Sequence, residues 1–537
     1  MHLTRVYIDG FKRLSNFNLS LNDDLNVIVG DNETGKTSVL EAINLVLTRQ
    51  YDGRSIDYAL DPYFFNIERV AKFFDNLRSG RVSSPPRILI EAYFNDDPLD
   101  AGLGTIKGTN NHDCTECPGL ALIIEPDNEY TDELKDYARN QDNPVILPTE
   151  YYGVQWLSFK GDRIKARSVP LKAKMIDTSI ARSYRGPSRH IAQLVSDDLP
   201  DEQRILLSLA YKKLRHQFSD GDGVKAINDL LAEKHRGGSG RTLRVQMDMS
   251  SRSSWESAIT PHLDDLPFDC VGKGEQCRVQ MRVAIAGAEK SRVLLIEEPE
   301  NHLSHSNMST LMAEVAKQCE DKHQVILTTH SAFVLNKLGI DKLRLISKAG
   351  QTAALALLDP ETADYFKKLP GYDTLRLILA KRAILVEGPS DELIVQRAYK
   401  DKHGVLPLEH GVDVISVGTA FKRFLAVAFL LGLNVQVVTD NDGDVVRLRN
   451  KYAEYLDKKN STIGICYDDD QSYPTLEPQL LKANSIEVLN RILGTQHDTA
   501  EALTAYMMGN RKTECALRFF ETTTTWKAPE YIDRAIQ

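Results

Sequence analysis

The sequence predicts an α/β protein of several domains, and three observations support this prediction. Apolar strand-like runs alternate with helical stretches towards both ends of the chain, a purely helical stretch separates them, and the composition is ordinary for a folded protein. The 537 residues are 42% hydrophobic and 26% charged, which provides enough apolar material for large cores. The net charge of −9 gives no global attraction to nucleic acid or anionic membranes, but it leaves a local basic groove possible.

Four segments follow from the order of these patterns. Residues 1–165 mix strands with one clear helix, and residues 166–240 contain helical stretches that we interpret as an inserted arm. Residues 241–375 return to an α/β pattern, which we expect to open with a strand near residues 236–249. Residues 376–537 alternate strand and helix, so we expect a separate Rossmann-like domain with a parallel sheet.

The sequence favours a cytoplasmic protein without a membrane partner. The longest apolar run, 424–433, is far shorter than the roughly 20 residues of a membrane-spanning helix, and the N-terminus reads as a strand rather than a signal peptide. Seven cysteines without framework spacing fit reduced thiols. Cys114 and Cys117, with His112, offer up to three zinc ligands, but no second pair completes a site, and surface thiols are the favoured interpretation.

The first motif that indicates chemistry is a phosphate-binding loop. Gly30–Thr37 reads G-x-x-x-x-G-K-T, and it follows the strand-like run LNVIV and opens a helical stretch, which is the context this motif needs. Lys36 would neutralise the β- and γ-phosphates of ATP, and the Thr37 hydroxyl would bind Mg²⁺. The loop residues that we expect to contact ATP are Gly30, Asn32, Gly35, Lys36, Thr37 and Ser38.

A second motif places two adjacent carboxylates at the end of an apolar strand. Residues 293–296 lead into Glu297 and Glu298, and alternation along a strand would point their side chains in opposite directions. We expect Glu297 to hold Mg²⁺ and Glu298 to activate the attacking water.

Two shorter motifs complete this set. Gly272–Gln276 opens a helical stretch, and the strand 325–329 ends at His330. The order of these motifs resembles the ABC-type ATPases of the SMC and RecF branch. The resemblance implies that Lys273, Gly274 and Gln276 contact an ATP held by a second subunit and that His330 senses its γ-phosphate. Lys273 departs from the family pattern, which has Ser at this position.

The C-terminal segment gathers carboxylates at strand ends. Glu387 and Asp391 follow one strand, and Asp440 and Asp442 follow another, so all four should lie at the carboxyl edge of a parallel sheet. They cannot all ionise cheaply without a cation, and oxygen ligands favour Mg²⁺ or Mn²⁺. Glu477 is a candidate for a further metal ligand.

The E-G-x-x-D and D-x-D motifs resemble the Toprim domain. An ABC-type ATPase with a helical insertion and a C-terminal Toprim domain resembles the OLD (overcoming lysogenization defect) family of nucleases. The resemblance implies a metal-dependent DNA endonuclease in bacterial anti-phage defence, a homodimer or higher oligomer formed through the helical dimerisation arm, and Lys512 as a catalytic cation. It leaves open whether a helicase, a retron reverse transcriptase with its RNA and DNA, or an HNH protein acts beside it.

Our interpretation is an ATP-regulated endonuclease that uses Mg²⁺ or Mn²⁺, with Glu387, Asp440 and Lys512 as catalytic residues. A topoisomerase would need a tyrosine breakage domain, and a primase would need an N-terminal zinc module; we see neither in the sequence. A different class remains open, namely a DNA-binding ATPase clamp or sensor whose carboxylate domain is structural. The direction of ATP regulation is also open, and we favour inhibition.

Overall fold

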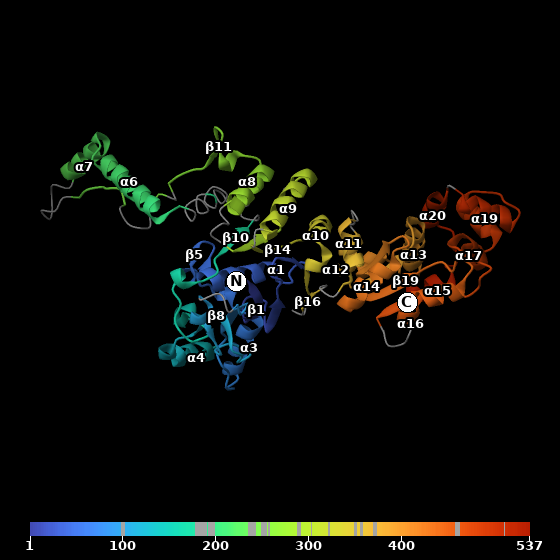
Figure 1. Ribbon diagram of the computed structural model, residues 1–537, viewed down its shortest axis with the longest axis horizontal. Coiled ribbons are helices and arrows are strands. Elements are labelled where there is room, and N and C mark those ends of the chain that lie inside the picture. Colours follow the sequence, from blue (N-terminus) through green and yellow to red (C-terminus); the bar gives the residue numbers. More distant parts are fainter. Residues whose placement is uncertain are drawn as a thin grey trace. The chain divides into compact units, whose positions relative to one another are not determined.

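The computed structural model divides, by its internal contacts, into two units, which we describe separately (Figure 1). Unit 1 comprises Met1–Ile28 and Gly35–Thr329, and unit 2 comprises Val29–Thr34 and His330–Gln537. The structure describes residues 1–97, 102–177, 191, 199–234, 243–248, 255, 258–286, 292–301, 303–320, 323–347, 352–354, 358–368, 373–456, 462–509 and 511–537. Within these ranges no helix combines the length and apolar character needed to cross a membrane.

Unit 1 contains an antiparallel sheet with strand order β2-β1-β6-β8-β7, and β9 also pairs with β8. The strands are β1 (Leu3–Asp9), β2 (Phe17–Ser20), β6 (Ile88–Phe94), β7 (Lys107–Gly108), β8 (Cys117–Pro126) and β9 (Tyr152–Ser158). Every residue of β6 is buried, and all of them except Glu91 are apolar or aromatic. The predicted N-terminal strand is confirmed as β1, and the other strands of this sheet agree with the strands expected within residues 1–165.

The second sheet of unit 1 is parallel and carries the nucleotide motifs. Its strands in spatial order are β10 (Ala173–Asp177), β13 (Val293–Glu297), β14 (Gln324–Thr328) and β3 (Leu25–Val29). The last three are buried at every position, as expected for strands covered on both faces. Gln324 ties the two sheets together, since its amide hydrogen-bonds both the N–H and the carbonyl of Leu3 at 2.8 and 2.7 Å.

Helix α1 (Lys36–Thr48) packs against strands of both sheets. Nine of its residues are buried, and the indole N–H of Trp156 donates to the Val46 carbonyl at 2.8 Å. The helix is therefore part of the core of unit 1. Apart from the two helices of residues 201–234, the longer helices of unit 1 among the described residues are α3 (Ile67–Arg78), α4 (Thr131–Arg139), α8 (Lys273–Ala286) and α9 (His305–Glu320).

The predicted helical arm is present as α6 (Asp201–Ser219) and α7 (Asp222–Lys234). A further predicted helix at residues 190–199 lies almost wholly outside the described residues. The expected strand near residues 236–249 is wrong for 243–248, where the structure assigns no strand. Side chains of the arm take up backbone groups there instead of a neighbouring strand: Asn228 bonds both the N–H and the carbonyl of Val245, and Ser219 accepts from the Met247 N–H.

Unit 2 contains a four-stranded parallel sheet, drawn in orange and red in Figure 1. Its order is β18 (Val412–Ser416), β17 (Arg382–Val386), β19 (Asn434–Val438) and β20 (Ile463–Cys466). The main helices are α13 (Pro389–His403), α14 (Phe421–Leu431), α15 (Val445–Lys451), α17 (Leu476–Ala483), α18 (Ile486–Leu493), α19 (Ala500–Met508), α20 (Lys512–Glu521) and α21 (Glu530–Ala535). The predicted strand–helix alternation is confirmed, so the carboxyl ends of β17 and β19 meet at one edge.

The preceding part of unit 2 is smaller. It contains the antiparallel pair β15 (Leu343–Ile346) and β16 (Thr352–Ala354) and the helices α10 (Ala332–Leu338), α11 (Pro360–Lys368) and α12 (Asp373–Leu379). α12 packs against α14 and β18, and therefore adjoins the four-stranded sheet.

Candidate functional site

The start of α1 and the end of β13 bring two predicted magnesium ligands together. The Thr37 hydroxyl donates a hydrogen bond to the Glu297 carboxylate, and Glu297 is buried at the end of its strand. A hydroxyl and a carboxylate in contact at the N-terminus of a helix are the oxygen ligands that Mg²⁺ takes in a nucleotide site. Lys36, the first residue of the helix, is only 5% exposed. These contacts fit Mg²⁺ with ATP as the ligands of this loop.

The backbone of the loop has the strained shape that a phosphate cradle requires. Glu33 and Gly35 have positive φ angles of 64° and 96°. A Cβ at Gly30 would lie 2.6 Å from both the Ile346 carbonyl oxygen and the Thr34 hydroxyl, so only glycine fits there. Asn32 lies in the turn between these positions, and Ser38 is buried in the first turn of α1.

Glu298 requires a correction to the sequence interpretation. Strand β13 ends at Glu297, and Glu298 has a φ of 40°, in the left-handed region. Alternation along the strand therefore does not set the direction of its side chain. The turn does so: the Glu298 N–H donates to the Thr328 carbonyl at 3.1 Å, and the Asn301 amide donates to its carboxylate at 3.0 Å.

The short Gly motif opens helix α8, which begins at Lys273. Lys273 is exposed and Gly274 is partly exposed, whereas Gln276 is 4% exposed. The amide of Gln276 donates to the carbonyl of Phe268 at 2.7 Å, so it closes the turn before the helix. The three residues thus share one helix start, and their contact with ATP of a second subunit stays a prediction.

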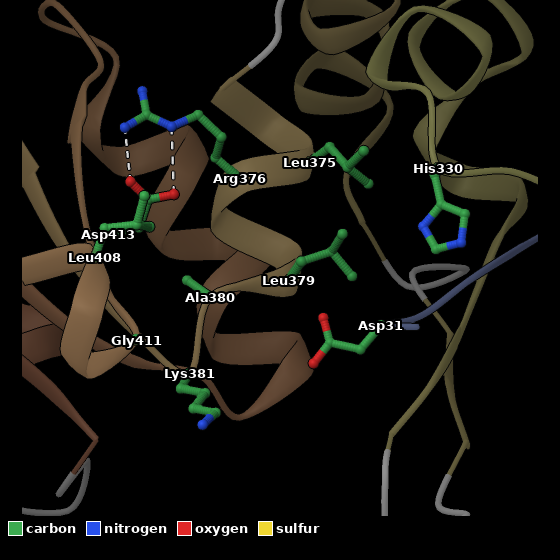
Figure 2. A pocket seen from close by; sticks show the side chains of 10 residues that line it. All are labelled: Asp31, His330, Leu375, Arg376, Leu379, Ala380, Lys381, Leu408, Gly411 and Asp413. Carbon is green, nitrogen blue, oxygen red and sulfur yellow. Dashed lines mark hydrogen bonds and ion pairs between the residues drawn. The ribbon is translucent and has the colours of Figure 1, made fainter. Parts of the chain in front are cut away.

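His330 lines a pocket of 340 Å³ within unit 2, shown in Figure 2. Asp31, the second residue of the phosphate loop, lines the same pocket, and Leu375 and Leu379 of α12 project towards it. Arg376, which follows Leu375 in α12, is fixed to the parallel sheet, because its guanidinium donates to the carboxylate of Asp413 in β18 at 2.6 Å. The pocket therefore joins two nucleotide-motif residues to a helix that is anchored on the carboxylate domain. Its remaining lining residues are Ala380, Lys381, Leu408 and Gly411.

The carboxylates of the parallel sheet occupy the predicted edge. Glu387 follows β17, and Asp391 lies in the first turn of α13, where its carboxylate accepts the Gly388 N–H at 3.0 Å. Asp440 and Asp442 follow β19; Asp442 has a φ of 50°, and its N–H donates to the Pro474 carbonyl at 3.1 Å.

Mutual repulsion marks these groups as one cluster. Burial raises the pKa of Asp440 to about 8, and the charges of Asp391, Glu387, Glu477 and Asp442 add to the rise. Burial also raises the pKa of Asp391, to about 6. The charges of Glu387 and Glu477 add to this rise, whereas the hydrogen bond from the Gly388 N–H opposes it. The pKa of Glu387 is raised by burial and by Asp442. A divalent cation would relieve this repulsion, and the oxygen ligands suit Mg²⁺ or Mn²⁺.

The cluster is not yet a closed coordination shell. In the part of the chain that the structure describes, no three His, Cys, Asp or Glu side chains are arranged to hold a metal ion as they stand. The donor set fits the cation chemically, and the assignment of Glu387, Asp391, Asp440, Asp442 and Glu477 as ligands stays a prediction.

Lys512 lies at this cluster, as the sequence interpretation requires. It is the first residue of α20, and its ammonium is 3.0 Å from the carboxylate of Glu477, whose side chain is 7% exposed. Burial alone would lower the pKa of Lys512, but the Glu477 hydrogen bond and the charges of Asp440 and Asp391 outweigh it and raise the pKa. The lysine thus stays charged beside the carboxylates.

Asn441 is a site residue that the sequence interpretation missed. It is 3% exposed, and its amide donates to the carbonyls of Asp468 and Asp470 at 2.8 and 3.0 Å. Its side-chain oxygen accepts the Gly443 N–H at 2.9 Å. Asn441 therefore fastens the loop that carries Asp440 and Asp442 to the neighbouring loop after β20. The sequence signal that could have indicated it is an asparagine between two aspartates, Asp440 and Asp442.

The zinc alternative at the Cys114–Cys117 pair gains no support. No three-residue ligand group occurs in the described ranges, which include both cysteines and His112. The His112 ring stacks on Tyr7 at 4.0 Å, and its backbone N–H donates to the buried carboxylate of Glu91 at 2.9 Å. Surface thiols in a structured loop remain the favoured interpretation.

Comparison with known families agrees with this division of motifs. A model of an AAA ATPase domain matches residues 1–142, and an AAA domain model named for the AbiEii toxin of a Type IV TA system matches residues 227–336. The Overcoming lysogenization defect protein-like TOPRIM domain model matches residues 378–442, which include Glu387, Asp391, Asp440 and Asp442.

Whole-chain relatives give the same picture. The chain is 26% identical to an OLD nuclease of Thermus scotoductus (strain ATCC 700910 / SA-01) over 85% of each protein. It is 21% identical to endonuclease GajA of Bacillus cereus (strain VD045), covering 82% of this chain and 75% of GajA. It is 24% identical to a DNA replication and repair protein RecF of Magnetococcus marinus (strain ATCC BAA-1437 / JCM 17883 / MC-1), covering 59% of this chain and 89% of that protein. The chain therefore combines an ATPase domain with a C-terminal OLD-like Toprim domain, and it is similar to an OLD nuclease and to endonuclease GajA over most of its length.

Proposed function

We propose that the protein is a DNA endonuclease that needs a divalent cation at its Toprim edge and is regulated by ATP. The observation that carries the proposal is the cluster of mutually repelling carboxylates, with Lys512 against Glu477, at the carboxyl edge of the parallel sheet. The relatives named OLD nuclease and endonuclease GajA support the same reaction.

The roles of the residues follow from their positions. Glu387 and Asp440 would hold Mg²⁺ or Mn²⁺, with Asp391, Asp442 and Glu477 as further ligands. When bound, such cations polarise a phosphodiester and supply a reactive water. Lys512 would place its positive charge next to the reacting phosphate and stabilise the charge that develops there. Its contact with Glu477 keeps the ammonium pointing towards the cluster.

The ATPase part of the proposal uses the contacts of unit 1. Lys36 would bind phosphate oxygens, Thr37 and Glu297 would hold Mg²⁺, and Glu298 would orient and activate water. We expect Lys36→Ala to abolish ATP binding because it removes the phosphate charge, whereas Glu298→Gln should bind ATP but hydrolyse it at least about 100-fold more slowly. Equilibrium binding of a fluorescent ATP analogue and phosphate-release assays measure the two effects. Unchanged ATP turnover in both variants would contradict the assignment.

The arm helices support assembly into a homodimer. α6 exposes Leu206, Leu209, Leu214 and Phe218, at 57% or more each, and α7 exposes Ile227 and Leu230 at 54% and 51%. Apolar faces of this kind are usually covered in an assembly. Sedimentation at micromolar concentration, with and without ATP, tests this; a strictly monomeric species would refute it.

The decisive experiment for the reaction is plasmid nicking with Mn²⁺ or Mg²⁺. The proposal expects nicked and linear products that disappear with EDTA, whereas a DNA-binding clamp or sensor with a structural carboxylate domain would leave the plasmid supercoiled. Repeating the assay across an ATP titration, with Lys36→Ala alongside, tests regulation, which we expect to be inhibitory. Equal rates at every ATP concentration would show that the domains are not coupled. A role in anti-phage defence stays a prediction from the family resemblance.

A further inference from the structure

Helix α15 presents two cations beside the carboxylate edge. The helix begins at Val445, directly after the loop that carries Asp440 and Asp442, and Asp444 caps it by accepting the Arg447 N–H at 2.9 Å. Val445 and Leu448 are buried, while Arg447 and Lys451 are exposed. Since residues four apart lie on the same side of a helix, the two cations share one face.

These cations differ from their neighbours in having no acidic partner. Among the residues that the structure describes, neither Arg447 nor Lys451 forms an ion pair, whereas Arg449 of the same helix pairs with Asp469 at 2.9 Å and also bonds the Tyr467 hydroxyl. In a chain with a net charge of −9, unpaired cations at an acidic edge call for an external anion.

The Lys451 side chain lies against two aromatic rings. Its ammonium lies 5.0 Å from the centre of the Tyr452 ring and 5.9 Å from that of the Phe421 ring, and both side chains are buried. Its charge reaches Glu387, because Lys451 and Lys512 both oppose the rise in the pKa of that carboxylate. Lys512 forms an ion pair with Glu477, whereas Lys451 forms no ion pair with the residues that the structure describes.

We propose that Lys451 and Arg447 bind the phosphate backbone of the DNA substrate and position it over the carboxylate edge. This inference rests on the proposed nuclease function and adds the surface along which the DNA lies. Phosphate contacts from exposed lysine and arginine set the position of the DNA without reading its sequence. Their positive charges would also offset the repulsion between the DNA phosphates and the carboxylates of the edge. Both residues are therefore positioning residues.

The test compares cations of the same helix in the full-length protein. Lys451→Met removes the charge but keeps an apolar stem over the Tyr452 ring, Lys451→Arg restores a charge, and Arg449→Gln removes an already paired cation as the control. Fluorescence anisotropy with a short labelled duplex, across a salt titration in EDTA, reports binding without cleavage.

We expect Lys451→Met to weaken binding about 5- to 10-fold and to lower the slope of log affinity against log salt by about 0.9, since one phosphate contact is lost. Arg447→Gln should act similarly, Lys451→Arg should retain the slope, and Arg449→Gln should match the wild type. Equal affinity and slope for Lys451→Met and the wild type, with melting temperatures unchanged, would overturn the inference. If the wild type still nicks plasmid in that case, the proposed function stands; if it neither binds nor nicks DNA, both fail.

Discussion

Buried carboxylates occur in two regions of the molecule with opposite surroundings. Glu91, in the antiparallel sheet of unit 1, is 2% exposed, yet the Tyr93 hydroxyl donates to it at 2.7 Å and the His112 N–H at 2.9 Å. Burial raises the pKa of Glu91, and the hydrogen bonds from these two donors reduce that rise. At the Toprim edge, Asp440 is surrounded by four acidic side chains that add to its raised pKa.

The difference separates an acid that the protein itself supplies with hydrogen-bond donors from acids that lie beside like charges. The hydrogen bonds to Glu91 come from the protein itself, and they fix the loop around His112 to the sheet. The Toprim carboxylates repel one another, so their arrangement costs stability unless a cation joins them. Burial alone therefore does not identify a site; the sign of the neighbouring charges does.

The largest expected effect is the loss of cleavage at the Toprim edge. Glu387→Ala and Asp440→Ala should each reduce plasmid nicking more than about 100-fold, because each removes a ligand of the catalytic cation. ATP hydrolysis should be spared, since its motifs lie elsewhere in the chain. Glu91→Gln is the matched control, a buried acid whose loss should leave nicking within about twofold. Retained cleavage in both Toprim variants would place the chemistry elsewhere.

A smaller effect is expected for Lys512→Ala. Nicking should slow by about 10- to 100-fold because the charge beside the phosphate is lost. The affinity for Mn²⁺, measured by isothermal titration calorimetry, should change little, since lysine is not a ligand. A loss of Mn²⁺ binding equal to that of Asp440→Ala would assign Lys512 a role in building the site instead.

The pH dependence of stability sharpens the comparison further. The pKa of Asp440 rises from an ordinary 3.8 to about 8, so the folded protein holds a proton that the unfolded chain releases. The stability that comes from this bound proton is complete below the ordinary pKa of 3.8. It is lost as the pH rises towards 8. In EDTA the wild-type melting temperature should fall across this range more steeply than that of Asp440→Asn, and Mn²⁺ should abolish the difference. Parallel melting curves for the two proteins in EDTA would contradict the repulsion.

The smallest effect is expected at Glu91. The pKa of Glu91 is raised, as that of Asp440 is, so wild-type stability should decrease as the pH rises through it. Glu91→Gln should remove this dependence of stability on pH. An amide can still accept the His112 N–H, so the loss of stability at neutral pH should be about 1 kcal/mol or less. Chemical denaturation at several pH values measures it. A much larger loss would mean that the ionised form of Glu91 is essential to the sheet.

Much of the fold and many of the site positions follow from the sequence, because local pattern and chain connectivity determine them. The run LNVIV before the phosphate loop predicted β3, and the spacing of strands and helices after Lys381 predicted the parallel sheet and placed Glu387 and Asp440 at one edge. Both predictions depend on periodicity and on the rule that parallel strands end together.

Other features depend on contacts that a local pattern does not contain. The segment 243–248 looks like a strand, but side chains of the arm take its backbone groups, and no periodicity reveals that competition. Glu298 departs from strand alternation because β13 ends one residue earlier in a left-handed turn. Whether Lys451 has an ion-pair partner among the described residues depends on which acids the fold places nearby, and this is a tertiary property.

The amide between the two acids after β19 limits how this site can be moved or redesigned. Asn441 donates two hydrogen bonds to carbonyls of the loop after β20, which a carboxylate cannot do. A third acid at position 441 would add negative charge between Asp440 and Asp442. It would also lose the hydrogen bonds that join their loop to the loop after β20. Anyone transplanting the catalytic edge into another scaffold would therefore have to carry Asn441 and the Asp468–Asp470 loop together with the acids, because the portable unit is the fastened pair of loops.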